Sequence, residues 1–242
     1  AIQAHKIDLL GESRKDHFVG IWVNRNAKRK RSSDVLMSWK VFLDALEENY
    51  GHKNATLIMH TEPLDNEGAN LFMVADELNI TNNVYFSRDR LEFSEMNIVY
   101  NICDFSLNIS YAEGFGLPTL EAMQAAVPMI AVKTGGLTRQ VVDHRDKSEN
   151  GVALDVDLKT LVGSQSVPFI YEDYTSCDNI ANGMMKLYKL SPKNRAKLKD
   201  KVRSYALSEF NLDDTVTAWH ETMSVCIENW KENYASWECF TI

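Results

Sequence analysis

The sequence lacks the features that mark membrane-spanning and disulfide-stabilised proteins. No apolar run approaches the roughly 20 residues of a membrane-spanning helix, and no signal peptide is visible. The four cysteines, Cys103, Cys177, Cys226 and Cys239, have neither CxxC nor paired spacing. Such cysteines are more typical of reduced thiols than of a disulfide framework. These absences predict an intracellular, cytoplasmic protein.

Positive charge is also scarce. Lys and Arg number 26 against 34 for Asp and Glu, which gives a formal net charge of -8. Nucleic acids and anionic membranes are bound through clustered positive surface, so this balance argues against general affinity for either. No group of His, Cys, Asp and Glu has the spacing of zinc ligands.

The length of 242 residues is long for one domain and short for two. The composition, 45% hydrophobic and 25% charged, is ordinary for a globular domain with a sizeable core. The polar residues 1–17 are interpreted as an entry or linker segment. Residues 18–210 are predicted to form the domain, and residues 211–242 a terminal helix and tail.

Residues 104–136 have the pattern of a strand, a glycine-containing loop, a helix and a second strand. Residues 104–111 and 128–132 are short, apolar and β-prone. Pro118 favours a first helical turn, and helix-forming residues follow it. Such units have parallel strands with the loop at their carboxyl ends, where open α/β sheets bind ligands. We therefore predict an α/β fold with a Rossmann-like, doubly wound parallel sheet and helices on both faces.

The remaining sequence supplies further elements. Ser33 or Asp34 is expected to cap one helix, and Asp213 or Asp214 the last one. Residues 159–173 are predicted to be irregular. We expect further strands at 18–23, 56–60, 84–87 and 150–154, and helices at 33–50, 71–78, 94–103, 176–190, 191–209 and 213–230.

The loop after residue 111 suits a ligand with phosphate and hydroxyl groups. Gly114 and Gly116 have no Cβ, so an anion can approach backbone N–H donors beside the positive end of the helix dipole. Glu113 and Glu121 are acceptors that suit sugar or ribose hydroxyls. A nucleotide sugar has both kinds of group. Each feature also has a purely structural explanation, since Glu121 in a first helical turn complements the dipole.

A basic run, NRNAKRKR at residues 24–31, follows the first predicted strand. Three interpretations compete: a nucleic-acid or localisation patch, a solvated loop, and a site for a diphosphate. The third is chemically sound because Arg offers a rigid donor fork and Lys a mobile point charge.

The segment from Glu113 to Glu121, EGFGLPTLE, followed by Pro128 and the Gly135-Gly136 pair, resembles the E-x7-E signature of retaining GT-B glycosyltransferases of family four. Such enzymes have two Rossmann-like halves, and only motifs of the second are visible here. The resemblance therefore implies the carboxyl-terminal, donor-binding half of a larger enzyme. The terminal helix would pack toward a missing amino-terminal domain through an aromatic patch. That patch comprises Trp230, Tyr234, Trp237 and Phe240.

The resemblance also implies roles for individual residues. Arg25 and Lys30 match the spacing of the family's diphosphate-holding Arg and Lys, which stabilise charge on the leaving group. Glu113 would hold a donor-sugar hydroxyl, and Glu121 the ribose hydroxyls. The other donor-binding residues would be Gly114, Phe115, Gly116 and Leu117 in the loop, with Ser87, Arg88 and Leu91 around the base.

The implied reaction transfers a sugar from a GDP- or UDP-sugar, with GDP-mannose slightly favoured, to an unknown glycan, lipid or protein acceptor. The configuration would be retained, and neither metal nor another cofactor is expected. Any membrane contact would be peripheral and made through the missing half. Two alternatives stay open: a module that binds nucleotide sugars without transfer, and a phosphorylase or epimerase on the same fold.

The chain departs from the family at two places. Thr138-Arg139 stands where many members have Pro-Glu, and Ala126 stands where a helix-terminating Gly is common. Asp155 and Asp157 form a D-x-D triplet, the metal-binding mark of the other glycosyltransferase architecture. Because this triplet lies downstream of the E-x7-E unit, we expect it to hold no metal.

Overall fold

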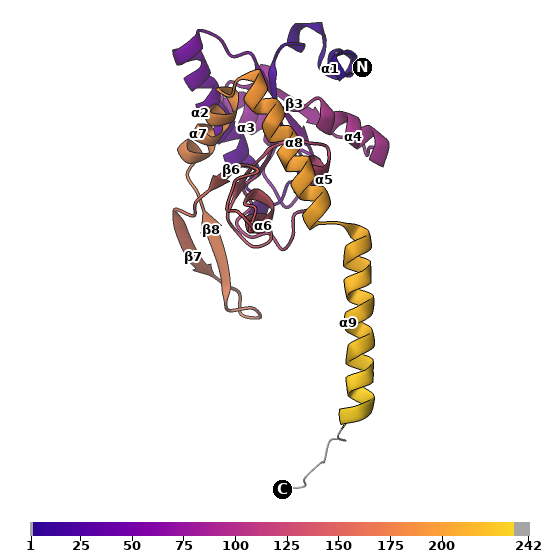
Figure 1. The fold of residues 1–242 in the computed structure, drawn as a ribbon. Coiled ribbons are helices and arrows are strands. Elements are labelled where there is room, and N and C mark those ends of the chain that lie inside the picture. Colours follow the sequence, from indigo (N-terminus) through magenta and orange to yellow (C-terminus); the bar gives the residue numbers. More distant parts are fainter. Residues whose placement is uncertain (1, 235–242) are drawn as a thin grey trace.

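Six parallel strands form the central sheet of the computed structural model, which describes residues 2–234 (Figure 1). Their order is β3-β2-β1-β4-β5-β6, which confirms the predicted doubly wound sheet. The strands are β1 (Phe18–Val23), β2 (Ala55–His60), β3 (Val84–Ser87), β4 (Phe105–Asn108), β5 (Met129–Val132) and β6 (Gly151–Leu154).

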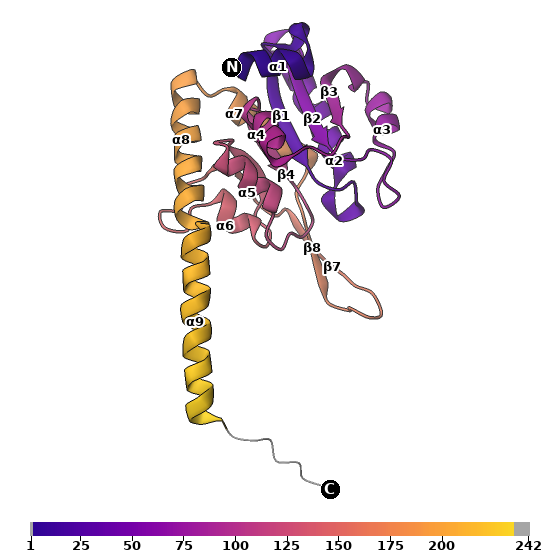
Figure 2. The same cartoon turned by 90° about the vertical axis from the view of Figure 1, so that its right-hand side faces the viewer.

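Helices cover both faces of this sheet (Figures 1 and 2). One face packs against α2 (Ser32–Tyr50), α3 (Leu71–Glu77) and α7 (Cys177–Tyr188). The other packs against α1 (Ile2–Leu10), α4 (Phe93–Asn101), α5 (Leu117–Gln124), α6 (Leu137–Val141) and α8 (Pro192–Glu209).

Side-chain alternation along β1 explains the two layers. Phe18 and Trp22 point into the core under α2, whereas Val19 and Ile21 point into the core under α4. Between them, Gly20 makes room for Phe105 of β4, because a Cβ at Gly20 would lie 2.3 Å from the Phe105 ring.

The start of α2 differs from the prediction that Ser33 or Asp34 caps it. A 3₁₀ turn, η2 (Lys28–Lys30), leads through Arg31 with φ of 58° directly into the helix at Ser32. Asp34 binds the Arg31 Nε at 2.8 Å instead of capping the helix. Arg31 Nη2 also donates to the Thr175 carbonyl at 2.9 Å.

The segment interpreted as an entry or linker and the segment predicted to be irregular both contain regular structure. Residues 2–10 form α1, whose Leu10 is buried against the α4 layer, and the turn η1 (Glu12–Arg14) follows. The domain boundary proposed at residue 17 stays a prediction. The irregular structure predicted for 159–173 is wrong, because β7 (Leu158–Val162) and β8 (Ile170–Tyr174) form an antiparallel hairpin that projects from the domain (Figure 2).

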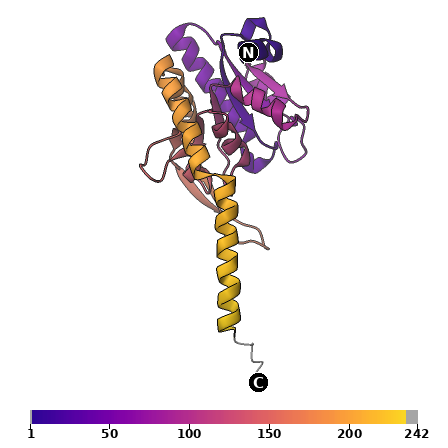
Figure 3. The same ribbon diagram turned by 45° about the vertical axis from the view of Figure 1, so that its right-hand side comes forward.

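Helix α9 (Leu212–Asn233) continues from α8 and extends away from the domain (Figure 3). Its cap is Asn211, which accepts from Asp214 N at 3.1 Å, so the predicted Asp213 or Asp214 cap is wrong. None of its residues is buried. Of the predicted aromatic patch, Trp230 and Tyr234 are exposed, and the other two residues, Trp237 and Phe240, lie outside the described residues. Over residues 2–234, no helix combines the length and apolarity that crossing a membrane requires.

Candidate functional site

The loops after β1 and β4 lie side by side at the point where the strand order reverses. In open α/β sheets this switch point is where ligands bind. The loop after β1 contains η2, and the loop after β4 leads into α5. The glycine loop, as we call residues 113–117, therefore lies beside η2 at what we call the switch-point edge of the sheet.

Lys30 and Glu113 meet at this edge. Lys30 Nζ donates to Glu113 Oε2, and the two side chains are only 10% and 11% exposed. Ser110 Oγ lies 3.4 Å from the same carboxylate oxygen. Burial lowers the pKa of Lys30, and the Glu113 carboxylate opposes that change. An anionic ligand at this point would compete with Glu113 for the Lys30 ammonium.

Arg29 is a second cation at the same carboxylate and was not singled out from the sequence. Its Nη1 lies 3.9 Å from Glu113 Oε2 and 3.4 Å from the Ala112 carbonyl oxygen, and most of its side chain is exposed. Its own carbonyl accepts from Tyr111 N at 2.9 Å, which ties η2 to the loop after β4. The basic run pointed to this region but did not tell which of its cations face Glu113.

Arg25 does not join this group. Its Nε and Nη2 bind Asp65 at 2.7 and 3.1 Å, and its Nη1 lies 3.1 Å from Glu67. The side chain is 59% exposed. Asp65 is only 15% exposed and binds the guanidinium through two nitrogens, so another anion must displace this two-bond pair to reach Arg25.

The glycine loop is docked on the Gly135-Gly136 turn that follows β5. Gly136 N donates to the Glu113 carbonyl at 3.1 Å. A Cβ on Gly135 would lie 2.0 Å from that carbonyl oxygen, and one on Gly136 would lie 2.5 Å from the Gly114 carbonyl oxygen. Two backbones therefore touch at this point, and only glycine permits the contact. Gly114 itself has open space around its Cα.

Two buried amides support the glycine loop, and neither was foreseen from the sequence. Gln140 Nε2 donates to the carbonyls of Phe115 at 2.7 Å and Gly116 at 3.3 Å. Asn108, at the end of β4, accepts from Ser110 Oγ at 2.7 Å and donates to Thr119 Oγ1 at 3.2 Å. The sequence does not indicate which carbonyl or hydroxyl group a polar residue in a short apolar segment will contact.

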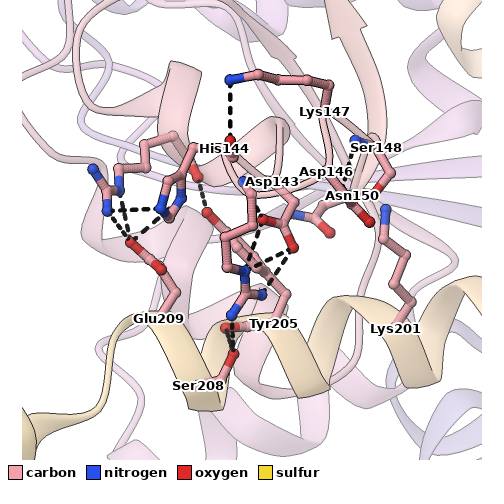
Figure 4. A network of polar contacts seen from close by, with 12 residues as sticks. Asp143, His144, Asp146, Lys147, Ser148, Asn150, Lys201, Tyr205, Ser208 and Glu209 are labelled. Carbon is pink, nitrogen blue, oxygen red and sulfur yellow. Dashed lines mark hydrogen bonds and ion pairs between the residues drawn. The ribbon is translucent and has the colours of Figure 1, made fainter.

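A polar network fastens α6, which contains Gln140, to α8 (Figure 4). Arg139 Nε donates to Glu209 at 2.6 Å, and Tyr205 Oη donates to the Arg139 carbonyl at 2.6 Å. Arg145 binds Asp143 through two nitrogens, at 2.8 and 2.9 Å, and lowers the pKa of that carboxyl to about 2. Arg139, which belongs to the Thr138-Arg139 departure from the family pattern, therefore pairs with Glu209 of α8.

Glu121 lies on α5, about one helical turn beyond the end of the glycine loop. Its carboxylate accepts from Tyr100 Oη at 3.0 Å, a hydroxyl that also lies 3.2 Å from the Pro118 carbonyl. Burial, with the nearby Glu121 charge, raises the pKa of Tyr100. Tyr100 occupies one acceptor position of the carboxylate and leaves others for a ligand hydroxyl.

The three residues predicted around the base share a separate hollow. Ser87, Arg88 and Leu91 line a hollow of about 450 Å³ beside the end of β3, which contains no residue of the glycine loop. Arg88 binds Glu62 at 3.2 Å, and Ser87 Oγ lies 2.9 Å from His60 Nδ1. The hollow lies two strands from β1, at the same carboxyl edge of the sheet.

The D-x-D triplet has structural partners. Asp155 pairs with Lys133, and Asp157 accepts from Ser176 N at 2.8 Å and from Asn179 Nδ2 at 2.9 Å, at the start of α7. In the part of the chain that the structure describes, no three His, Cys, Asp or Glu side chains come together as metal ligands.

Comparison with known proteins identifies relatives of this chain. The family model described as glycosyl transferases group 1 matches residues 12–205. A D-inositol 3-phosphate glycosyltransferase of Corynebacterium jeikeium is 35% identical over 111 residues, which are 40% of this chain and 26% of that protein.

Solved structures share the fold. Sucrose-phosphate synthase of Thermosynechococcus elongatus matches 93% of this chain and 48% of its own, with a TM-score of 0.68 and 18% identity. Anabaena HepE in complex with UDP and glucose matches 93% and 52%, with a TM-score of 0.69 and 18% identity. The C-terminal domain of the LpcC group 1 protein of Francisella tularensis matches 88% and 94%, with a TM-score of 0.62 and 21% identity. This chain therefore spans about half the length of the first two.

Proposed function

The chain belongs to the group 1 glycosyl transferases, and we propose that it is the donor-binding half of an enzyme that transfers a sugar from a nucleoside-diphosphate sugar with retention of configuration. The match to the family model agrees with the resemblance that the E-x7-E segment shows to glycosyltransferases. The observation that supports the proposal most is the meeting of Lys30 and Glu113 beside the glycine loop, at the start of α5.

Each group at the switch-point edge has a use in this reaction. The N-terminus of α5 and the loop amides attract the diphosphate. As the bond from the sugar to the diphosphate breaks, negative charge grows on the leaving oxygen, and the Lys30 ammonium stabilises it. Once the diphosphate takes over Lys30, Glu113 is free to accept from a sugar hydroxyl. The reaction then requires no metal.

Arg25 joins the site by exchanging partners. The diphosphate replaces Asp65 and Glu67 as the partner of the exposed Arg25 guanidinium, which offers the same donor fork to a phosphate as to a carboxylate. Glu121 holds the ribose hydroxyls while Tyr100 keeps the carboxylate in place. The hollow at Ser87, Arg88 and Leu91 frames the base.

The donor is a UDP- or GDP-sugar. HepE has been solved in complex with UDP-glucose, which makes UDP the first nucleotide to test. GDP-mannose stays a prediction from the sequence. The chain spans about half the length of sucrose-phosphate synthase and HepE, and the acceptor and the activity of the whole enzyme are proposed to depend on sequence outside it.

Calorimetric titration of the chain tests the proposal. UDP, GDP, UDP-glucose and GDP-mannose are titrated with a chelator and then with magnesium. Lys30→Met removes a charge-assisted hydrogen bond of about 1.5 to 3 kcal/mol, so the affinity for the bound nucleotide should fall roughly 10- to 150-fold. Lys28→Met is the matched control, because Lys28 is exposed and lies two residues away on the same turn.

Glu121→Ala should remove the preference for a ribose hydroxyl. Wild-type chain should bind UDP more tightly than 2′-deoxy-UDP, and the variant should bind both alike. Equal loss of affinity in the Lys28 and Lys30 variants would show that only net charge matters, which contradicts the proposed site. A folded chain that binds none of the four nucleotides would also contradict the proposal.

A further inference from the structure

Gln140 holds two consecutive peptide groups of the glycine loop with one nitrogen. Its side-chain amide reaches the carbonyl oxygens of Phe115 at 2.7 Å and Gly116 at 3.3 Å. The residue is fully buried on α6, beneath the loop. Both N–H groups of the carboxamide are thus directed at the loop backbone.

The direction of these carbonyls fixes the direction of the N–H groups that follow them. A peptide group is planar and trans, so its C=O and N–H point in opposite directions. With the Phe115 carbonyl turned toward Gln140, the Gly116 N–H points away from α6. The Gly116 carbonyl also accepts from Thr119 N at 3.1 Å and Leu120 N at 3.2 Å, so α5 itself directs the Leu117 N–H and Gln140 adds a further contact. Neither N–H has an acceptor among the described residues, as is usual in the first turn of a helix.

The side-chain oxygen of Gln140, unlike its nitrogen, is not satisfied. Gln140 Oε1 is buried and has no hydrogen-bond partner among the described residues. A buried carbonyl oxygen without a donor lowers stability, and an apolar side chain of similar size would avoid that loss. The polar side chain at this position is therefore explained by the two carbonyls that it holds.

Gln140 is itself held in place. Its main-chain carbonyl accepts from Asn150 Nδ2 at 2.8 Å. The preceding residue, Arg139, is bound to Glu209 and Tyr205 of α8 (Figure 4). The amide therefore acts from a fixed helix on a loop in which Gly114, Phe115 and Leu117 are exposed.

We propose that Gln140 is a positioning residue that, through the Phe115 carbonyl, aims the Gly116 N–H beside the first N–H groups of α5 at the diphosphate of the donor, an inference that rests on the proposed function. Gln140 does not touch the ligand. It sets the geometry of the backbone donors before the ligand arrives, which is the advantage of a preorganised anion site.

The test compares ligands with and without phosphate. Gln140→Met keeps the length and removes both donors. Its affinity for UDP or GDP should fall about tenfold, which corresponds to about 1.4 kcal/mol. The affinity for uridine or guanosine, followed by ligand-observed NMR, should change less than about twofold. Val141→Ala is the matched control, since Val141 is the next residue of α6 and is fully buried in the apolar cluster.

Gln140→Glu adds a readout that a purely structural role would not move. An ionised carboxylate donates no hydrogen bond, but its protonated form donates one. Burial raises the pKa of a carboxyl, so diphosphate binding by this variant should be weak near about pH 8 and partly recover near about pH 5.

The outcomes separate this inference from the proposed function. A wild-type chain that binds neither UDP nor GDP overturns both. A wild-type chain that binds, with a Gln140→Met variant that binds equally well, overturns the inference alone. Equal losses for the diphosphate and the nucleoside, or an equal loss of diphosphate affinity in Val141→Ala, would show a general effect on the fold and also overturn it. If Gln140→Met does not fold, the pH profile of Gln140→Glu decides.

Discussion

Gly136→Ala should disturb the glycine loop without straining its own backbone. Gly136 has φ of -63°, which any residue adopts. Its added methyl group would nevertheless lie 2.5 Å from the Gly114 carbonyl oxygen and 2.7 Å from Phe115 Cα. Both neighbours are backbone atoms, so no side chain can rotate out of the way. The glycine loop must move away from the turn after β5.

The expected loss of stability follows from two opposing terms. Overpacking of this kind costs about 1 to 3 kcal/mol. Replacing Gly by Ala at a permitted φ returns about 0.4 to 1 kcal/mol by restricting the unfolded chain. The net loss is about 1 to 2 kcal/mol, and the Tm should fall by roughly 2 to 8 °C for a chain of this size.

Gly114→Ala is the matched comparison. A Cβ at Gly114 would meet no heavy atom within 4 Å. The variant should therefore have an unchanged or slightly higher Tm. Its methyl group would lie where the diphosphate is proposed to approach, so the affinity for UDP or GDP should fall about tenfold.

Differential scanning fluorimetry and calorimetric titration of both variants measure the two effects. Gly136→Ala should lower both the Tm and the nucleotide affinity, and Gly114→Ala only the affinity. A Gly136→Ala variant with wild-type Tm would refute the close contact between Gly136 and the backbone of the glycine loop. A Gly114→Ala variant with wild-type affinity would place the diphosphate elsewhere.

Two further predictions concern stability. Ala126 has φ of 62°, so Ala126→Gly should raise the free energy of unfolding by about 1 kcal/mol, whereas the control Ala125→Gly, at φ of -81°, should lower it; urea denaturation distinguishes them. Asp143→Asn should cost about 1 kcal/mol at neutral pH, because its partner Arg145 is half-exposed. The Asp143 pKa is lowered to about 2, so the difference from wild type should persist above about pH 4 and shrink as the pH falls toward 2; a constant difference would contradict the ion pair.

The sequence predicted the sheet because its strands are short, apolar and separated by helices with clear signals. The helices predicted at 176–190 and 191–209 are α7 and α8, which Ser176 and Ser191 cap. The β7–β8 hairpin was missed because its strands lie on the surface. Its exposed residues alternate poorly, and residues 163–169 between the strands contain Gly, Ser and Pro, which favour an irregular interpretation.

The glycine loop could be located from sequence, but its support could not. The glycines at 114, 116, 135 and 136 are visible as two pairs, yet nothing in the sequence says that one pair packs on the other. Gln140 lies in a helix of five residues, where helical periodicity is too short to identify a buried face. Contacts between loops depend on the tertiary fold, so their partners appear only in the structure.

The basic run shows why charge alone did not identify the site. In a 3₁₀ turn each residue is rotated by about 120° from the last, so Lys28, Arg29 and Lys30 project in three directions. Lys28 faces solvent, Arg29 lies at the edge of Glu113, and Lys30 pairs with Glu113 below the surface. Arg31 follows and is buried, with Tyr111 and Tyr174 beside its guanidinium.

Four consecutive cations thus have four different environments, and only two of them reach the carboxylate of the glycine loop. With Lys30 already neutralised by Glu113, a diphosphate gains little from simple attraction at this point. It must instead exchange places with the carboxylate, and the buried position of the pair makes that exchange most favourable for a ligand that satisfies both groups. A nucleotide sugar does so, because its diphosphate takes Lys30 and its sugar hydroxyl takes Glu113. UDP and GDP reach Lys30 and the loop amides but offer no sugar hydroxyl to Glu113, so each should bind more weakly than its nucleotide sugar.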